Sequence, residues 1–179
     1  MRKAFRSGTA CAILLAGLAV TGYETYYVAP AEAQSLAAES TAGVESSVRV
    51  FMRHVAHDVT QGGPAAWRKY FADSPAFFMA VNGKIAFASG AEAIAGLPQI
   101  ATAIKQIELK WGDDLRVDPL APDLAAVGVS YHELQLWAVG RRVQENGYFT
   151  GVVQYRDGHW KLRDCHWSEP VPPSPAPTQ

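Results

Sequence analysis

Two residues in one predicted strand have side chains suited to acid–base chemistry. Tyr131 and Glu133 are two positions apart within residues 127–135, so in an extended strand both side chains point to the same face. A glutamate in a partly dry cavity could act as a base, and a tyrosine hydroxyl could donate a hydrogen bond to its substrate. The alternative is a solvated glutamate at the rim of a sheet, which is the usual environment of this residue.

Two further candidates for a base are a histidine and an aspartate far from that strand. His166 has an ordinary pKa of about 6.5, and strict alternation places it on the face of Trp160. Its ring could instead order the strand end through a hydrogen bond. Asp58 lies at the edge of the apolar stripe of a predicted helix, but its neighbours His54 and His57 do not converge with it, so we predict no metal site.

Large aromatic side chains could line a pocket for an apolar ligand, although many of them are expected to belong to the core. The candidates are Phe78, Trp111, Tyr131, Trp137, Tyr148 and Trp160. The sequence contains no nucleotide-binding loop, nucleophile elbow or zinc-ligand spacing, so it predicts no cofactor.

Helices are predicted mainly in the N-terminal half. A helix capped by Ser40 or Thr41 carries an apolar stripe of Val44, Val48, Phe51, Val55 and Val59. A Gly62-Gly63-Pro64 sequence ends it and starts a short second helix through Trp67, Tyr70 and Phe71. A third helix, capped by Ser89 and Glu92, carries apolar residues to Ile107 and is expected to kink or divide at Pro98.

Strands are predicted mainly in the C-terminal half. Asn82-Gly83 favours a tight hairpin between residues 77–81 and 84–88. Four longer strands follow, at residues 108–117, 124–137, 142–156 and 160–167, with short connections that imply antiparallel neighbours. The pattern predicts one α+β domain with helices on one face of a bent sheet.

The ends of the chain differ in composition from this domain. Arg2, Lys3 and Arg6 precede an apolar run, which predicts a signal peptide over residues 1–33 and a periplasmic or secreted protein, with an uncleaved N-terminal anchor as the alternative. After cleavage no membrane span is predicted. Residues 34–39 are expected to be a spacer, 40–168 the domain, and 169–179 a proline-rich disordered tail.

Composition limits the classes of partner. The chain has 179 residues, 49% of them hydrophobic, and a formal net charge of -1. This content suits one globular domain, and the charge gives no reason to expect nucleic-acid binding. Cys165 would be the single cysteine of the cleaved chain, so no internal disulfide is expected.

The last predicted hairpin resembles the closing strands of the nuclear transport factor 2-like superfamily. The residues are Arg156-Asp157-Gly158-His159-Trp160-Lys161-Leu162, followed by His166-Trp167-Ser168. The resemblance is nearest to SnoaL-like and DUF4440-type bacterial domains and to the association domain of calcium/calmodulin-dependent kinase II. It implies a cone-shaped domain with N-terminal helices packed on a strongly curved antiparallel sheet, a pocket between them, and a homodimer formed by the outer sheet face.

Departures from the family limit what this resemblance implies about function. The catalytic acids and bases of ketosteroid isomerase and the polyketide cyclases have no clear match here. The kinase association domain has arginines in its pocket where this sequence has Tyr131 and Gly151, so an arginine-lined anion pocket is not expected.

Three functions therefore remain open from the sequence. The leading hypothesis is an exported protein that binds a small, mostly apolar molecule. The second is an isomerase, dehydratase or cyclase with Glu133, His166 or Asp58 as base and Tyr131 as donor, and the third is an oligomerisation module with a filled pocket. A cavity of roughly 300 Å³ or more with Glu133 or His166 exposed inside it would favour the first two.

Overall fold

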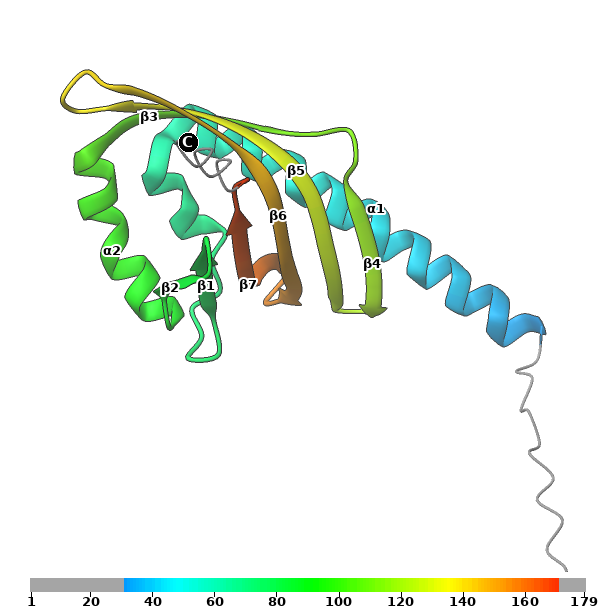
Figure 1. The fold of residues 1–179 in the computed structure, drawn as a ribbon. Coiled ribbons are helices and arrows are strands. Elements are labelled where there is room, and N and C mark those ends of the chain that lie inside the picture. Colours follow the sequence, from blue (N-terminus) through cyan, green and yellow to red (C-terminus); the bar gives the residue numbers. More distant parts are fainter. Residues whose placement is uncertain (1–30, 171–179) are drawn as a thin grey trace, which may run out of the picture.

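The structure is a computed structural model that describes residues 31–170. Residues 1–30 of the predicted signal peptide and 171–179 of the predicted tail lie outside this range. The elements are α1 (Ala31–Gly62), η1 (Gly63–Lys69), β1 (Phe78–Val81), β2 (Lys84–Phe87), α2 (Gly90–Ala103), β3 (Ile104–Trp111), β4 (Arg116–Ala121), β5 (Leu124–Trp137), β6 (Arg142–Arg156) and β7 (His159–Ser168). The predicted α+β layer arrangement is confirmed, with long bent strands and helices on one side (Figure 1).

Helix α1 begins earlier than the sequence predicted. It starts at Ala31 instead of Ser40, and residues 34–39, predicted as a spacer, are helical. This segment is rich in alanine, glutamate, glutamine and leucine, which are strong helix formers. The predicted apolar stripe is confirmed, because Val48, Val55 and Val59 are fully buried.

The short second helix is a 3-10 helix that turns the chain back towards the sheet. Gly63 has a positive φ of 63°, and Pro64 follows in the first turn. Trp67 is buried within η1, and Tyr70 and Phe71 are buried just beyond it, as the sequence suggested. This turn places an aromatic cluster beside the hairpin of β1 and β2.

The hairpin and the third helix form where they were predicted. Asn82 and Gly83 have positive φ angles of 49° and 78°, as a two-residue turn requires. Ser89 Oγ accepts a hydrogen bond from the Glu92 backbone N–H at 3.2 Å and so caps α2.

The end of α2 differs from the prediction. The helix passes through Pro98 as one element and ends at Ala103, so of the two expected effects of Pro98, a kink or a division, the division is wrong. One proline removes only one helical hydrogen bond, and Ala93 and Leu97 hold the same helix face against the core. Ile104 and Ile107, predicted as helical, begin β3 instead.

The sheet has the strand order β2-β1-β7-β6-β5-β3, with β4 also paired to β5. The long neighbours β3, β5, β6 and β7 pair antiparallel, as their short connections predicted. However, β1 pairs with β7 in parallel, so the sheet is mixed. The predicted strand over residues 108–117 is divided into β3 and β4 at Gly112-Asp113-Asp114, where Asp114 Oδ1 accepts hydrogen bonds from the backbone N–H and hydroxyl of Ser130.

A β-bulge in β7 changes which side chains face the helices. Val152 pairs with Asp164 and Val153 with Leu162, so Arg163 is an extra residue on β7. Beyond it, Cys165 is buried on the inner face and Trp167 faces the same way, while His166 points to the outer face. The predicted shared face of His166 and Trp160 is therefore wrong, because the extra residue reverses the alternation.

The core lies between α1 and the inner face of the sheet. Val129 on β5, Phe149 on β6 and Leu162 on β7 are at most 1% exposed and pack with the α1 stripe. Over residues 31–170, no helix combines the length and apolar character that crossing a membrane would require.

Candidate functional site

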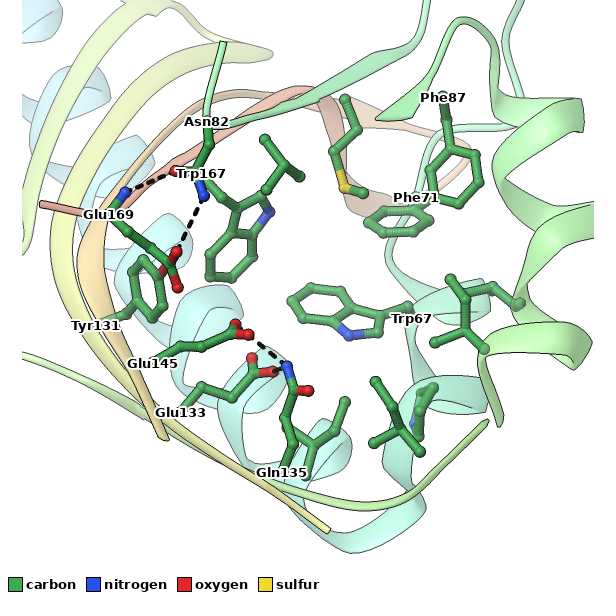
Figure 2. A pocket seen from close by; sticks show the side chains of 17 residues that line it. Trp67, Phe71, Asn82, Phe87, Tyr131, Glu133, Gln135, Glu145, Trp167 and Glu169 are labelled. Atoms are coloured by element: carbon green, nitrogen blue, oxygen red, sulfur yellow. Dashed lines mark hydrogen bonds between the residues drawn. The ribbon is translucent and has the colours of Figure 1, made fainter. Parts of the chain in front are cut away.

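A cavity of about 230 Å³ lies between the inner face of the sheet, including its edge strands β1 and β2, and the helices η1 and α2 (Figure 2). Most of its wall is apolar, and representative side chains are Trp67, Phe71, Met79, Phe87, Leu97 and Ile100. The volume is below the roughly 300–1,000 Å³ typical of sites for drug-sized ligands, so it does not reach the size that would favour a binder or an enzyme, although Glu133 does line the cavity. Any ligand of this cavity is therefore small.

The polar wall of the cavity is acidic. Tyr131, Glu133 and Gln135 come from β5, Glu145 comes from β6, and Glu169 follows β7. Figure 2 shows these side chains together on one side of the cavity, opposite Trp67, Phe71 and Phe87. None of the described residues that line the cavity is basic.

Strand geometry brings the first two glutamates together. The pattern of alternate buried residues along β5 places Tyr131, Glu133 and Gln135 on the inner face. Glu145 lies directly opposite Glu133 in the β5–β6 ladder. Facing carboxylates repel each other unless a donor or a proton lies between them.

Gln135 supplies that donor. Its side-chain NH2 donates to Glu133 Oε1 at 2.7 Å and to Glu145 Oε2 at 3.2 Å. The Trp137 Nε1–H donates to Gln135 Oε1 at 2.9 Å, and this fixes the direction of the amide. Both N–H bonds of the Gln135 amide are thus used within the acidic wall.

The environment of Glu133 brings the pKa of its carboxyl group close to neutral pH. Its side chain is only 8% exposed, so the solvated rim position that is usual for glutamate does not apply. Burial raises the pKa of the Glu133 carboxyl to about 7, against a lowering effect of the Gln135 hydrogen bond. The negative charges of Glu145 and Glu169 act in the same direction as burial. Such a carboxyl can exchange a proton at physiological pH.

Glu169 is held at the cavity by the hairpin turn. Asn82 Nδ2 donates to Glu169 Oε2 at 3.0 Å, and the Glu169 backbone N–H donates to Asn82 Oδ1 at 2.8 Å (Figure 2). The Asn82 backbone N–H also donates to the carbonyl oxygen of Trp167. Since Asn82 is exposed and lines the cavity, the cavity reaches the surface here.

Tyr131 adds to the acidic wall a hydroxyl group that has no hydrogen-bond partner among the described residues. The residue is 6% exposed, and no described residue makes a hydrogen bond with its hydroxyl. Burial and the charges of Glu169, Glu145 and Glu133 raise the pKa of the phenol, which therefore keeps its proton.

The ring of Tyr131 is packed tightly between two strands. It meets Trp167 edge to face, with ring centroids 4.8 Å apart. Gly147 lies opposite it on β6, where a Cβ would come within 2.9 Å of Tyr131 Cε1 and would overlap the Ser168 carbonyl group. Glycine is therefore required beside Tyr131.

The other two predicted bases lie away from the cavity. His166 is on the outer face of the sheet because of the bulge at Arg163. Asp58 is on α1, where Lys69 Nζ and the Tyr70 hydroxyl each donate to Oδ2 at 2.6 Å. Hydrogen bonds from Lys69, Tyr70 and His57 hold the pKa of the Asp58 carboxyl below its usual range, so it is a poor base.

Of the predicted aromatic ligand residues, only Tyr131 lines the cavity. Trp111 and Trp160 pack against α1, where their indole N–H groups donate to the Met52 carbonyl and to Ser47 Oγ. Phe78 and Tyr148 are 41% and 38% exposed on the sheet. Trp137 acts indirectly, because it orients Gln135.

Several lining residues were missed by the sequence interpretation. Glu145 could not be placed from the predicted strand bounds alone, because pairing of residues 137 and 142 would put Asn146 opposite Glu133. The structure pairs Leu136 with Arg142, and this register brings Glu145 opposite Glu133. Gln135 shares the face of Glu133 by simple alternation. Trp167 and Glu169 had no such indication, because their orientation depends on the bulge.

The acidic wall does not form a metal centre. Among residues 31–170 no group of three or more His, Cys, Asp or Glu side chains is arranged to hold a metal ion. The arrangement can instead bind polar hydrogens, exchange one proton at Glu133 and enclose an apolar group against the facing wall.

The sequence matches no protein-family model and no curated protein. Solved structures do match the fold. A nuclear transport factor 2-like superfamily protein from Salmonella enterica serovar Typhimurium LT2 is 11% identical with a TM-score of 0.63, over 77% of this chain and 99% of that one. A provisionally assigned scytalone dehydratase from Novosphingobium aromaticivorans is 12% identical with a TM-score of 0.64, over 75% and 89%.

A third similar structure is a provisionally assigned calcium/calmodulin-dependent kinase II association domain from Xanthomonas campestris. It is 17% identical with a TM-score of 0.56, over 72% of this chain and 87% of that one. At these identities the likeness concerns the fold alone.

Proposed function

We propose that this chain, which has the fold of nuclear transport factor 2-like proteins, binds a small, mostly apolar molecule in the cavity between β5, η1 and α2. The observation that carries the proposal is a cavity with a mainly apolar wall and a hydrogen-bonded acidic wall facing it, in which Glu133 is buried. Buried carboxylates are costly to maintain, and such groups are frequent where ligands bind. An oligomerisation module with a filled pocket would have no need of this space.

A cavity-filling variant tests this proposal. Ile100→Trp places an indole into the cavity from α2, whereas Ile94→Trp on the same helix lies outside it and serves as the control. We expect native mass spectrometry to find a small molecule on the wild type and on Ile94→Trp, and NMR titration with toluene to show binding to both. Ile100→Trp should lose both properties. Equal toluene binding by the two variants would contradict the proposed site.

A second candidate function is acid–base catalysis in the same cavity. It is favoured by one observation, the presence of Glu133, with a pKa of about 7, beside the free hydroxyl of Tyr131. Glu133 would take a proton from a carbon atom of the substrate, and Tyr131 would donate a hydrogen bond to the oxygen that becomes negative. Two of the similar structures are provisionally assigned dehydratases, which supports testing this chemistry.

Turnover of analogues of the co-purified molecule would decide between binder and enzyme. Glu133→Gln and Tyr131→Phe should each lower the rate by about 10²–10⁴-fold if the residues act as base and donor. Asp58→Asn and His166→Ala should leave it unchanged, because both residues lie outside the cavity. A Glu133→Gln variant with full turnover would exclude this function.

We further propose that the protein is exported and forms a homodimer. Export is supported by the basic and apolar N-terminal residues alone, and mass spectrometry of the periplasmic or secreted protein should find a chain that starts near Gln34. The homodimer is supported by half-buried Leu134 and Leu136 and exposed Tyr148 on the outer face of the sheet. Similarity to an association domain points in the same direction.

A further inference from the structure

The charge of the cavity limits the ligands that it can accept. Glu133, Glu145 and Glu169 all line it, and no basic side chain among the described lining residues offsets them. In a partly dry site, repulsion between such carboxylates is far stronger than in water. An anionic ligand would add to this repulsion, whereas a ligand with a positive charge would relieve it.

Hydrogen-bonding capacity points to the same class of ligand. The Gln135 amide is saturated by Trp137, Glu133 and Glu145. What remains towards the cavity is mainly unshared acceptor capacity on the three carboxylates. Beside them lies the hydroxyl of Tyr131, a buried residue whose hydroxyl makes no hydrogen bond with any described residue. Such a wall is best satisfied by a ligand that brings several polar hydrogens, and a protonated amine brings up to three.

Aromatic rings adjoin the acidic wall at right angles to one another. Trp67 and Trp167 meet with ring centroids 5.8 Å apart and an interplanar angle of 87°. Trp167 and Tyr131 meet at 4.8 Å and 84°. Perpendicular aromatic walls around a cation are the arrangement by which proteins recognise ammonium groups through cation–π attraction.

We propose that the cavity binds a small organic cation, a protonated amine whose charged end lies against Glu133, Glu145, Glu169 and Tyr131 and whose apolar body lies against Trp67 and α2. This inference rests on the proposed binding function and names the class of its ligand. The cavity of about 230 Å³ limits the body to about one ring or a short branched chain.

Three one-ring probes test the inference: benzylamine, benzyl alcohol and benzoate, which differ mainly in charge. Binding is followed by the fluorescence of Trp67 and Trp167, which line the cavity, and by calorimetry. At pH 8 we expect benzylamine to bind at least about tenfold more tightly than benzyl alcohol, and benzoate to bind least. Benzylamine should also bind more tightly as pH rises from 6 to 8, with release of a proton from Glu133.

Matched variants separate the contribution of charge to the binding affinity from the contribution of the cavity's shape and apolar wall. Glu133→Gln should lower the affinity for benzylamine at least about tenfold at pH 8. The affinity of the same variant for benzyl alcohol should stay within about twofold of the wild-type value. Glu108→Gln changes a glutamate that forms a surface ion pair with Lys110 at 2.6 Å and should change neither affinity. Tyr131→Phe provides a second variant if Glu133→Gln folds poorly.

The two levels of the proposal fail in different ways. Equal or tighter binding of benzyl alcohol would overturn the cation inference and leave the cavity as a binding site for apolar molecules. Absence of binding by all three probes and by toluene would overturn both. Benzylamine affinity that is unchanged in both Glu133→Gln and Tyr131→Phe would also reject the acidic wall as the cation site.

Discussion

Glu133 links the chemistry of the cavity to the stability of the protein. Burial keeps its carboxyl protonated to a higher pH in the folded chain than in the unfolded chain, where its pKa is about 4.5. The folded state therefore holds one more proton between pH 4.5 and about 7. Over this window the contribution of Glu133 to the free energy of unfolding falls as pH rises.

We predict that Glu133→Gln removes this pH dependence. In the wild type the shift from 4.5 to about 7 corresponds to about 3 kcal/mol lost between these pH values. The neutral amide cannot ionise, so the variant should be more stable than the wild type at pH 8 and similar to it at pH 4.5. Urea unfolding at several pH values measures the difference, with Glu108→Gln as the control. A constant difference between variant and wild type across this range would show that Glu133 does not titrate there.

At the scale of elements, the bulge in β7 decides which aromatic residue faces the cavity. Inserting one alanine between Asp164 and Cys165 would shift the alternation by one position, turning Cys165 and Trp167 to the outer face and His166 inward. We predict a loss of roughly 3–5 kcal/mol in the free energy of unfolding, since large side chains leave the core. Arg163→Ala keeps the bulge and should cost less than about 1 kcal/mol. Urea unfolding followed by circular dichroism distinguishes the two, and wild-type stability of the insertion variant would contradict the assigned register.

Much of this arrangement follows from the sequence, because turn chemistry and alternation are local properties. Asn82-Gly83 and Asp157-Gly158 both have positive φ angles and join strands where expected. The bounds of β5 and β6 match the predicted ranges, and they place Tyr131 and Glu133 on the inner face. The fold class and about half of the residues of the polar wall could therefore be predicted from the sequence.

The remainder depends on contacts between distant segments. An extra residue in a strand leaves no mark in the local pattern of β7, so the inward orientation of Trp167 and the outward one of His166 could not be inferred. Likewise, the parallel pairing of β1 with β7 joins residues far apart in sequence. The burial of Glu133 contradicts the usual habit of glutamate, and only the neighbouring Gln135 and Trp137 explain it.

For the whole molecule, we predict that Leu134→Glu converts a dimer into a monomer. Leu134 lies half-buried on the outer sheet face beside Leu136, and a charge at the centre of an interface is strongly unfavourable. Light scattering after size-exclusion chromatography measures the mass. Val139→Glu, in the exposed turn between β5 and β6, is the control and should not alter it. A wild type that is already monomeric at high concentration would contradict the proposed dimer.

The attachment of the hairpin turn to the end of β7 also affects when the protein can fold during its synthesis. Asn82 and Glu169 are 87 residues apart in the chain, and β1 pairs only with β2 and β7. The cavity wall therefore cannot close until the segment up to Glu169 has left the ribosome, and contacts of this range form slowly. A polypeptide that stays open until β7 has been synthesised could pass unfolded through a narrow membrane channel, as the proposed export would require.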